Sequence, residues 1–313
     1  MNNNLNVKAV IDIGSNSIKL TVGQLDENGN LKILLDNSEI VQIRKGFING
    51  HISEEKIKQA SDVISQMVQT ARDNGADFPC LVGTMAMRQA LNADEFQNSV
   101  YENTGLRIRI LSGTEEANYS WRGAVESFSG EMLNDKDIVM FDTGGGSTEF
   151  VFGRGLKNIR SQSLPIGAIT VTEKFLSIGP ISQHSINNAV NFIRRILAEN
   201  DIKPIYQSEP LIIGLGGGVT AMASVKRGDD NAEHESLNGM ILTRQDLQDQ
   251  IKLFAPLTLE ERKKIPGLPP KRADVITSTA CTVSCILEAL NAGSCTLSLR
   301  GLRHAILKDL LTE

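Results

Sequence analysis

Two glycine-rich turns that each begin with an aspartate are the residues of this sequence best suited to chemistry. Residues 142–153 read DTGGGSTEFVFG and follow the apolar run DIVMF at 137–141. Residues 12–23 read DIGSNSIKLTVG and begin at the end of a predicted strand, 7–13. A turn of this kind places a carboxylate at a strand end and exposes backbone N–H groups, so it can hold a divalent cation and a phosphate together.

The two turns match each other. An offset of 130 residues aligns identical residues: Asp12 with Asp142, Gly14 with Gly144, Ser17 with Ser147, and Gly23 with Gly153. One such turn would also fit an ordinary hairpin with a polar tip, but the matched pair favours a functional role. We therefore predict two similar lobes that face a shared cleft, with Mg²⁺ or Mn²⁺ near Asp12 and Asp142. The phosphate-binding groups expected in the two turns are Ser15, Asn16, Ser17, Gly144, Gly145, Gly146 and Ser147.

A third glycine-rich segment, GLGGG at residues 214–218, has the context of a phosphate-binding loop. It ends a predicted buried strand, 210–215, and opens a predicted helix, 219–225. Glycine-rich turns between strands and helices are also common for packing alone, so the segment is a weak signal by itself. As a third such turn in one chain, it adds three predicted phosphate-binding residues: Gly216, Gly217 and Gly218.

Three charged side chains could act on a bound phosphate. Glu115 and Glu116 lie in the first turn of a helix that is predicted directly after strand 106–112. Acidic residues also favour helix N-termini because of the helix dipole, so a structural role is favoured on this ground alone. Arg88 lies just past a predicted strand, 80–85, where a solvated surface arginine is the simpler interpretation.

The remaining sequence predicts an α/β chain with a mixed sheet in each lobe, because strands and helices interleave in a duplicated order. Residues 31–43 read as the third strand of the first lobe. Asn92 and Glu95 have the spacing of a capping box at the start of a helix. A long apolar helix is predicted from residue 272 to residue 290.

The composition is that of an ordinary soluble globular protein. Of 313 residues, 41% are hydrophobic and 22% are charged, which suits two domains with their own cores. No apolar run could span a membrane, and the initial MNNNLNVK has no apolar signal core, so we expect a cytoplasmic protein. The net charge of −5 argues against broad nucleic-acid binding. The cysteines are expected to be reduced core residues rather than a metal site: Cys80, Cys281, Cys285 and Cys295.

A set of segments, in order and spacing, resembles the exopolyphosphatase/guanosine pentaphosphate phosphatase (Ppx/GppA) family. The segments cover nearly the whole chain: DIGSNS at 12–17, GTMAMRQALN at 83–92, ILSGTEEA at 110–117, DTGGGSTEF at 142–150, LPIGA at 164–168, GLGGGVTA at 214–221 and PGLPPKRADVI at 266–276. The chain is similar to the short form of that family, which has the actin-like (ASKHA) fold. The resemblance implies two lobes of ribonuclease H-like topology, over 1–120 and 121–300, with the closing helix at 301–313 packing back on the first lobe.

The resemblance also implies roles for the residues singled out above. Glu116 matches the family's proposed base for the attacking water, and Arg88 matches a phosphate-contacting arginine. Asp142 and Glu149 match metal-holding and water-positioning carboxylates, and Asp12 faces them from the first lobe. With the glycine turns fixing the terminal phosphate, this set would hydrolyse a phosphoanhydride in the presence of Mg²⁺.

Several positions depart from the family pattern. Gln42 stands where the family has an arginine, although Arg44 and Lys45 lie close to it in sequence. The others are Thr170 in place of arginine, Asn238 in place of histidine, Leu299 in place of aspartate and His304 in place of glutamate. These changes remove charges, so they bear on substrate affinity, processivity and preferred chain length.

The substrate that the resemblance implies is inorganic polyphosphate or guanosine pentaphosphate, and nothing in the sequence separates the two. A kinase or ATPase is an alternative that would need a nucleotide pocket near residues 214–218 and an acceptor, whereas Glu116 favours water as the nucleophile. A sensor that binds polyphosphate or a guanosine alarmone without turnover is a second alternative, consistent with the lost charges. A homodimer is expected from the family alone, and no nucleic-acid or membrane partner is expected.

Overall fold

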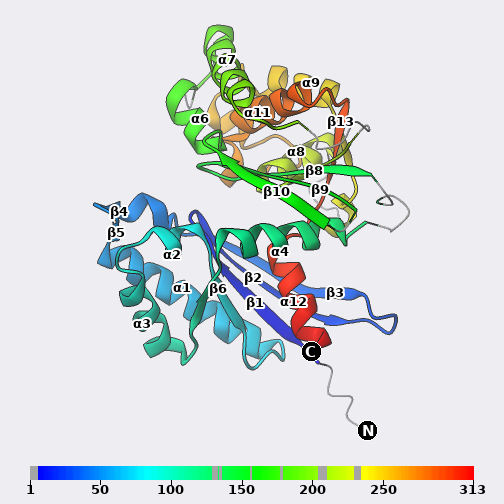
Figure 1. The fold of residues 1–313 in the computed structure, drawn as a ribbon. Helices are drawn as coiled ribbons and strands as arrows, with labels where there is room; N and C mark the ends of the chain where they lie inside the picture. The colour runs from blue at the N-terminus through cyan, green and yellow to red at the C-terminus, as the bar shows by residue number, and fades with distance from the viewer. Residues whose placement is uncertain are drawn as a thin grey trace. The chain divides into compact units, whose positions relative to one another are not determined.

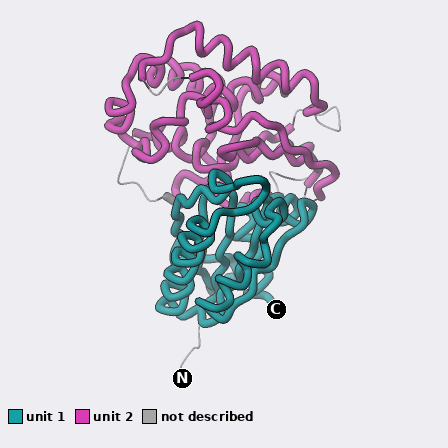
Figure 2. Tube along the Cα trace, turned by 90° about the vertical axis from the view of Figure 1, so that its left-hand side faces the viewer, with its two compact units in different colours: residues 1–123, 301–313 teal, residues 124–300 magenta. Residues whose placement is uncertain are grey.

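A computed structural model describes residues 6–128, 133, 136–155, 157–176, 179–203, 210–228 and 234–313. The chain divides into two compact units, shown in Figure 2: residues 1–123 with 301–313 form unit 1, and residues 124–300 form unit 2. Each unit contains one large mixed sheet with helices packed on it. Within the described ranges, no helix is both long enough and apolar enough to cross a membrane.

Unit 1 is organised on a five-stranded sheet with the strand order β3-β2-β1-β6-β7. Strands β1, β2 and β3 (Figure 1) are antiparallel neighbours. Strands β6 and β7 extend the sheet parallel to β1. The strands are Lys8–Ile13 (β1), Ser17–Leu25 (β2), Leu31–Ile40 (β3), Cys80–Gly83 (β6) and Ile108–Ile110 (β7), and a separate hairpin is formed by Phe47–Ile48 (β4) and His51–Ile52 (β5).

Helices cover both faces of this sheet. Side chains of α1 and α3 share a buried cluster with Ile11 and Ile13 of β1, whereas α12 shares another cluster with Val10. Because side chains alternate along a strand, Asp12 lies on the same face as Val10. The helices are Glu54–Asp73 (α1), Met85–Gln89 (α2), Ala93–Thr104 (α3), Gly113–Val125 (α4) and Leu302–Thr312 (α12), with a 3₁₀ turn at Ile43–Gly46 (η1).

The start of α3 differs from the sequence prediction. Asn92 does not cap the helix, because its side chain is held by β5: its Oδ1 accepts from the Ile52 N–H at 2.8 Å and its Nδ2 donates to the Ile52 carbonyl at 3.0 Å. Glu95 Oε2 instead accepts a hydrogen bond from the side-chain Nδ2 of Asn92 at 3.0 Å. The predicted capping box is therefore wrong, since a tertiary contact has taken the side chain that the local motif needs.

Unit 2 is organised on a six-stranded sheet with the order β10-β9-β8-β11-β13-β12. The antiparallel strands β8, β9 and β10 come first, and β11 then pairs with β8 in parallel. The strands are Asp137–Thr143 (β8), Thr148–Arg154 (β9), Lys157–Leu164 (β10), Leu211–Leu215 (β11), Ile241–Thr243 (β12) and Ser294–Leu297 (β13).

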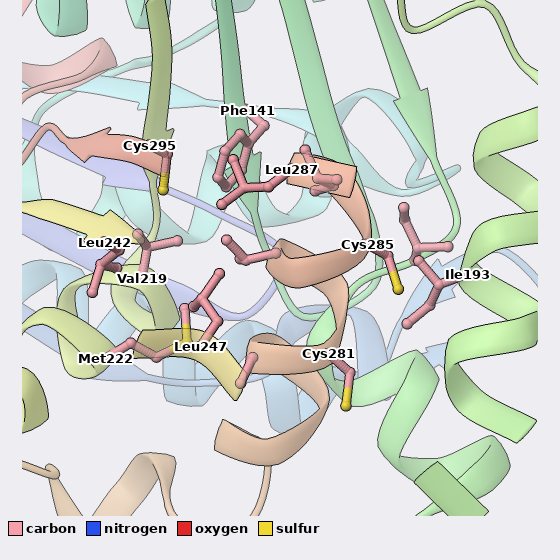
Figure 3. Close-up of a cluster of buried hydrophobic side chains, with 14 of the residues drawn as sticks. Phe141, Ile193, Val219, Met222, Leu242, Leu247, Cys281, Cys285, Leu287 and Cys295 are labelled. Atoms are coloured by element: carbon pink, nitrogen blue, oxygen red, sulfur yellow. The ribbon is translucent and has the colours of Figure 1, made fainter. Parts of the chain in front are cut away.

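The core of unit 2 joins this sheet to its helices. Phe141 of β8, Val219 of α8 and Leu287 of α11 belong to one buried cluster (Figure 3). Cys281 and Cys285 belong to it as well, and burial raises the pKa of each thiol to about 12. The helices are Ala168–Phe175 (α6), Gln183–Glu199 (α7), Gly217–Arg227 (α8), Arg244–Phe254 (α9), Leu259–Arg262 (α10) and Ile276–Ala289 (α11), with 3₁₀ turns at His234–Leu237 (η2) and Pro270–Arg272 (η3).

The two sheets repeat one topology, which confirms the duplication predicted from the sequence. In each unit, a first strand pairs antiparallel with the second and parallel with a later one. The repeat extends to single residues, because Asp12 faces Lys19 across β1 and β2, and Asp142 faces Glu149 across β8 and β9.

Gly123 packs against the segment that leads into the closing helix α12 of unit 1. A Cβ atom at Gly123 in α4 would overlap the backbone of Gly301, which directly precedes α12. We expect Gly123→Ala to lower the free energy of unfolding by about 1–3 kcal/mol, the usual cost of overpacking. Denaturant unfolding of the full chain measures this loss.

Gly293→Ala is the matched control for that measurement, since a Cβ atom there meets nothing within 4 Å. We expect this control to keep the unfolding midpoint of the wild type. Equal midpoints for Gly123→Ala and Gly293→Ala would contradict the close approach of α4 to Gly301.

Candidate functional site

The turn after β8 presents backbone N–H groups because its carbonyl oxygens are already bonded. The Gly144 N–H donates to the Ser147 carbonyl at 3.0 Å and closes the turn. The first residues of α6 take the remaining carbonyls: Ala168 N–H donates to Gly144 at 2.9 Å, Ile169 N–H to Gly145 at 2.8 Å, and Thr170 Oγ1 to Gly146 at 2.9 Å. The N–H groups of Gly145 and Gly146 bond to no described residue, so they can donate to a bound anion.

The turn after β1 has the same construction with different partners. The Gly14 N–H donates to the Ser17 carbonyl at 3.1 Å, as in the second copy. The Asn16 carbonyl accepts from residues 41 and 42, and the Ser15 carbonyl accepts from Arg44 at 3.1 Å. These bonds end β3 at Ile40 and start η1 at Ile43, so the strand predicted over residues 31–43 is shorter than expected.

Asp142 and Glu149 form a carboxylate pair in unit 2. They are directly opposed across β8 and β9, so both side chains lie on one face of the sheet. Glu149 Oε1 accepts from Ser147 Oγ at 2.5 Å and from Ser163 Oγ at 2.9 Å, which fixes its orientation beside the glycine turn. The equivalent pair in unit 1 is Asp12 with Lys19.

The donor chemistry of this pair fits Mg²⁺ or Mn²⁺. Both ions prefer oxygen ligands, and Mg²⁺ is commonly held by one or two carboxylates together with water and substrate phosphates. Within the described ranges, no group of three or more histidine, cysteine, aspartate or glutamate residues could hold a metal by itself. Asp142 with Glu149 therefore suits an ion that is completed by phosphate oxygens.

The third glycine-rich turn lies directly beside Asp142. Strands β8 and β11 are parallel with Leu215 paired to Asp142, so their turns leave the sheet at the same edge. Gly216 has a φ of 102°, and a Cβ atom there would approach Asp142 Oδ1 and the Thr143 carbonyl oxygen to 2.8 Å each. Glycine is required at this position, and Gly217 and Gly218 then open α8 next to the carboxylate.

Arg272 is a site residue that the sequence prediction missed. The helix predicted from residue 272 begins only at Ile276, and Arg272 ends the 3₁₀ turn η3 instead. Its guanidinium lies against the Gly217 backbone, where burial lowers its pKa and the carboxylates of Asp274 and Asp142 oppose that change. It makes no side-chain hydrogen bond to any described residue, so a cation is available beside the glycine turn.

The segment that carries Arg272 is anchored by a second, fully buried arginine. Arg262 donates from Nη1 to the Ala273 carbonyl at 3.1 Å and from Nη2 to the Gly179 carbonyl at 3.2 Å. Gly267 packs against the backbone of Ser224 in α8. The signal in the sequence was PGLPPKR at 266–272, because two successive prolines disfavour a regular helix at that point.

Arg88 and Glu116 come together in unit 1, as the sequence prediction needs. Arg88 Nη1 lies 2.7 Å from Glu116 Oε2 and also donates to the Leu111 carbonyl at 2.7 Å. Each side chain is a little over one quarter exposed, at 28% and 29%. The residues reach this point because β6 and β7 are parallel neighbours, so α2 and α4 both start at the same sheet edge.

The sequence left a structural role at the helix N-terminus open for both Glu115 and Glu116. In the structure, Glu115 has that role. It accepts from the Ser112 N–H at 2.9 Å and from Arg109 Nη2 at 2.6 Å. The Ser112 backbone bond, with the Arg109 guanidinium second, lowers the Glu115 pKa to about 2. Glu115 thus caps α4, while Glu116 points to Arg88.

Three of the positions that depart from the family pattern make structural contacts. Thr170 bonds to the Gly146 carbonyl of the turn, as described above. Asn238 Oδ1 accepts from the Leu299 N–H at 2.9 Å, and His304 Nδ1 accepts from the Gly301 N–H at 3.1 Å. At these three positions the side chain therefore serves a hydrogen bond within its own unit.

The repeated sheets, each with an aspartate at the end of its first strand, define a protein of the actin-like fold. The model of the Ppx/GppA phosphatase family matches residues 8–313. The chain belongs to this family, and the resemblance noted in the sequence is confirmed.

Known proteins agree with this assignment. A bifunctional 3-dehydroquinate synthase/phosphatase of Fusobacterium nucleatum is 28% identical over 293 residues, which is 90% of this chain and 43% of that protein. A guanosine-5'-triphosphate,3'-diphosphate pyrophosphatase of Photobacterium profundum is 26% identical over 311 residues, which is 97% of this chain and 59% of that protein. The chain thus spans about half the length of these curated relatives. A crystal structure of the Aquifex aeolicus Ppx/GppA family member is 28% identical with a TM-score of 0.83, covering 98% of this chain and 97% of that chain.

The depressed pKa of Glu115 predicts a pH dependence of stability. Its stabilisation is fully present above the unfolded-state pKa of about 4.3 and is lost as the pH falls toward the folded-state value of about 2. We expect Glu115→Gln to flatten the decline of the thermal midpoint between about pH 5 and pH 2. Thermal unfolding at several pH values measures the slope.

Glu102→Gln serves as the control, since Glu102 is an exposed carboxylate of α3 without a bond to a described residue. Its pH profile should run parallel to that of the wild type. A Glu115→Gln profile as steep as the control would show that Glu115 is not bonded as described.

Proposed function

We propose that this protein is a phosphoanhydride hydrolase that releases the terminal phosphate of inorganic polyphosphate, of guanosine pentaphosphate, or of both. Membership of the Ppx/GppA phosphatase family supports the reaction class. The observation that carries the proposal is the Arg88–Glu116 pair, which unites an anion-binding cation with a carboxylate at one sheet edge. This pairing suits water as the nucleophile, because a carboxylate can accept its proton while the arginine holds the phosphate.

The Arg88–Glu116 bond gives the reaction an order of events. Oxygens of a bound phosphate compete for the Arg88 guanidinium, so substrate binding draws the arginine away from Glu116 Oε2. The released carboxylate then orients a water and accepts its proton as the water oxygen bonds to the terminal phosphorus. The bridging P–O bond breaks on the opposite side, and the shortened phosphate chain leaves with the bond's electron pair.

Unit 2 carries groups of its own that suit a phosphate. The free N–H groups of Gly145 and Gly146 bind phosphate oxygens, and the Arg272 cation adds to the charge that faces them. Asp142 and Glu149 would hold Mg²⁺ or Mn²⁺, and the bound ion would neutralise phosphoryl oxygens. Asp12 remains a predicted metal-binding residue, as do Ser15, Asn16 and Ser17 for phosphate.

The choice between polyphosphate and guanosine pentaphosphate is part of the proposal, and so is the expected homodimer. One relative is named for the guanosine nucleotide, but the match covers only 59% of its length. Relative kcat/KM on long-chain polyphosphate and on the nucleotide decides the preferred substrate.

Glu116 and Glu115 provide a matched pair for testing the mechanism. Glu116→Gln should lower phosphate release from polyphosphate with Mg²⁺ by about 10²–10⁴-fold, the usual contribution of general base catalysis. Substrate binding should be retained, since the variant keeps the shape of the side chain. Initial rates and equilibrium binding are measured on the same preparations.

Glu115→Gln should keep kcat within about twofold at neutral pH, because Glu115 faces Ser112 and Arg109 instead. Unchanged turnover in Glu116→Gln would remove Glu116 from the mechanism. Tight polyphosphate binding by the wild type without phosphate release, with either Mg²⁺ or Mn²⁺, would favour the sensor function.

A further inference from the structure

Residues 41–46 are tied directly to the first glycine turn. The Gln42 N–H donates to the Asn16 carbonyl at 2.8 Å, and the Arg44 N–H donates to the Ser15 carbonyl at 3.1 Å. Gln42 adopts a left-handed conformation, with φ 55° and ψ 51°, which turns the chain out of β3 and into η1. The backbone of Arg44 is therefore fixed beside the turn that the sequence assigns to phosphate binding.

The side chain of Arg44 extends toward the catalytic edge of the unit 1 sheet. Its Nη1 lies 3.8 Å from Met85 Sδ at the start of α2, directly after β6. Met85 and Arg88 are three residues apart, so they are neighbours on one face of α2, with about 5–6 Å between their Cβ atoms. The Arg44 guanidinium thus contacts the residue that lies one helical turn before Arg88.

The charges of Arg44 and its neighbour Lys45 are not compensated in unit 1. Both side chains are exposed, and neither forms an ion pair with a residue in the described ranges. The sulfur contact of Arg44 is a weak one for a guanidinium. Two adjacent positive charges beside a glycine turn raise the local positive potential, so the arrangement favours a polyanionic ligand.

We propose that Arg44, supported by Lys45, forms a second phosphate subsite, which holds a phosphate group that lies beyond the terminal two of the chain. The proposal rests on the phosphatase function proposed above. It assigns to this part of unit 1 a phosphate group away from the end of the polyanion that is cleaved. It also accounts for Gln42, because the arginine absent from that position is supplied two residues later. A substrate that is long enough to reach both guanidinium groups gains from the subsite, and a short one does not.

The experiment compares long-chain polyphosphate with inorganic pyrophosphate as substrates for the wild type and Arg44→Gln. We expect the variant to raise KM for long-chain polyphosphate about tenfold with kcat within about twofold, as for the loss of one charge-assisted hydrogen bond. Its KM should also depend less steeply on salt concentration, because one charge contact is missing. The effect on pyrophosphate should be within about twofold.

A second variant separates this role from a structural one. Gln42→Arg combined with Arg44→Gln places the arginine where the family has it, and should restore KM to within about twofold of the wild type. Lys32→Gln is the matched control, since Lys32 lies at the other end of the β2–β3 ladder from Ser17 and should change nothing. KM values for Arg44→Gln that match the control at every salt concentration would overturn the subsite.

Equilibrium binding of long-chain polyphosphate distinguishes failure of the Arg44 subsite from failure of the proposed hydrolase function. If the wild type releases no phosphate but binds polyphosphate about tenfold more tightly than Arg44→Gln, the subsite stands and the hydrolase proposal falls. If the wild type releases phosphate and Arg44→Gln binds equally well, the hydrolase proposal stands and the subsite falls.

Discussion

In both glycine turns, the backbone carbonyl groups accept hydrogen bonds from neighbouring segments, and this leaves the N–H groups of the turn to face a ligand. In the turn after β8, the N-terminal residues of α6 bond to the carbonyls of Gly144, Gly145 and Gly146. In the turn after β1, residues 41–44 do the same for Ser15 and Asn16. A turn whose carbonyls are satisfied in this way leaves its N–H dipoles for an anion, and it binds without the cost of reorganising the backbone. The positions of α6 and η1 follow from this requirement.

The two copies of the turn have diverged in charge. Asp142 faces the carboxylate of Glu149, whereas Asp12 faces the ammonium of Lys19. A carboxylate pair suits a divalent cation, and an aspartate beside a lysine suits one less well because the lysine already offsets its charge. Unit 2 is thus the half that we propose to hold the metal, with the partly buried Arg272 as its cation, and unit 1 carries Arg88, Arg44 and the carboxylate proposed to activate water.

The repeat and its turns could be predicted from the sequence because they depend on local patterns. Identical residues at one sequence offset predict two equivalent strand pairs. The structure contains both pairs in the same register, so that Asp12 and Asp142 occupy equivalent positions in their two sheets. The errors arose where a distant segment supplies a bond. Ile52 takes the Asn92 side chain from its predicted cap, and Asn16 ends β3 early by accepting from residues 41 and 42. Arg272 was missed because its role comes from contact with Gly217, which lies 55 residues earlier in the chain.

We propose that the N–H groups of Gly145 and Gly146 bind phosphate. Amide NMR of protein labelled with ¹⁵N-glycine, titrated with inorganic pyrophosphate in the presence of Mg²⁺, measures this directly. We expect downfield shifts of the Gly145 and Gly146 amide protons, with the Gly105 and Gly293 signals unmoved. Saturating pyrophosphate that leaves both turn amides unshifted, while other glycine signals move, would contradict it.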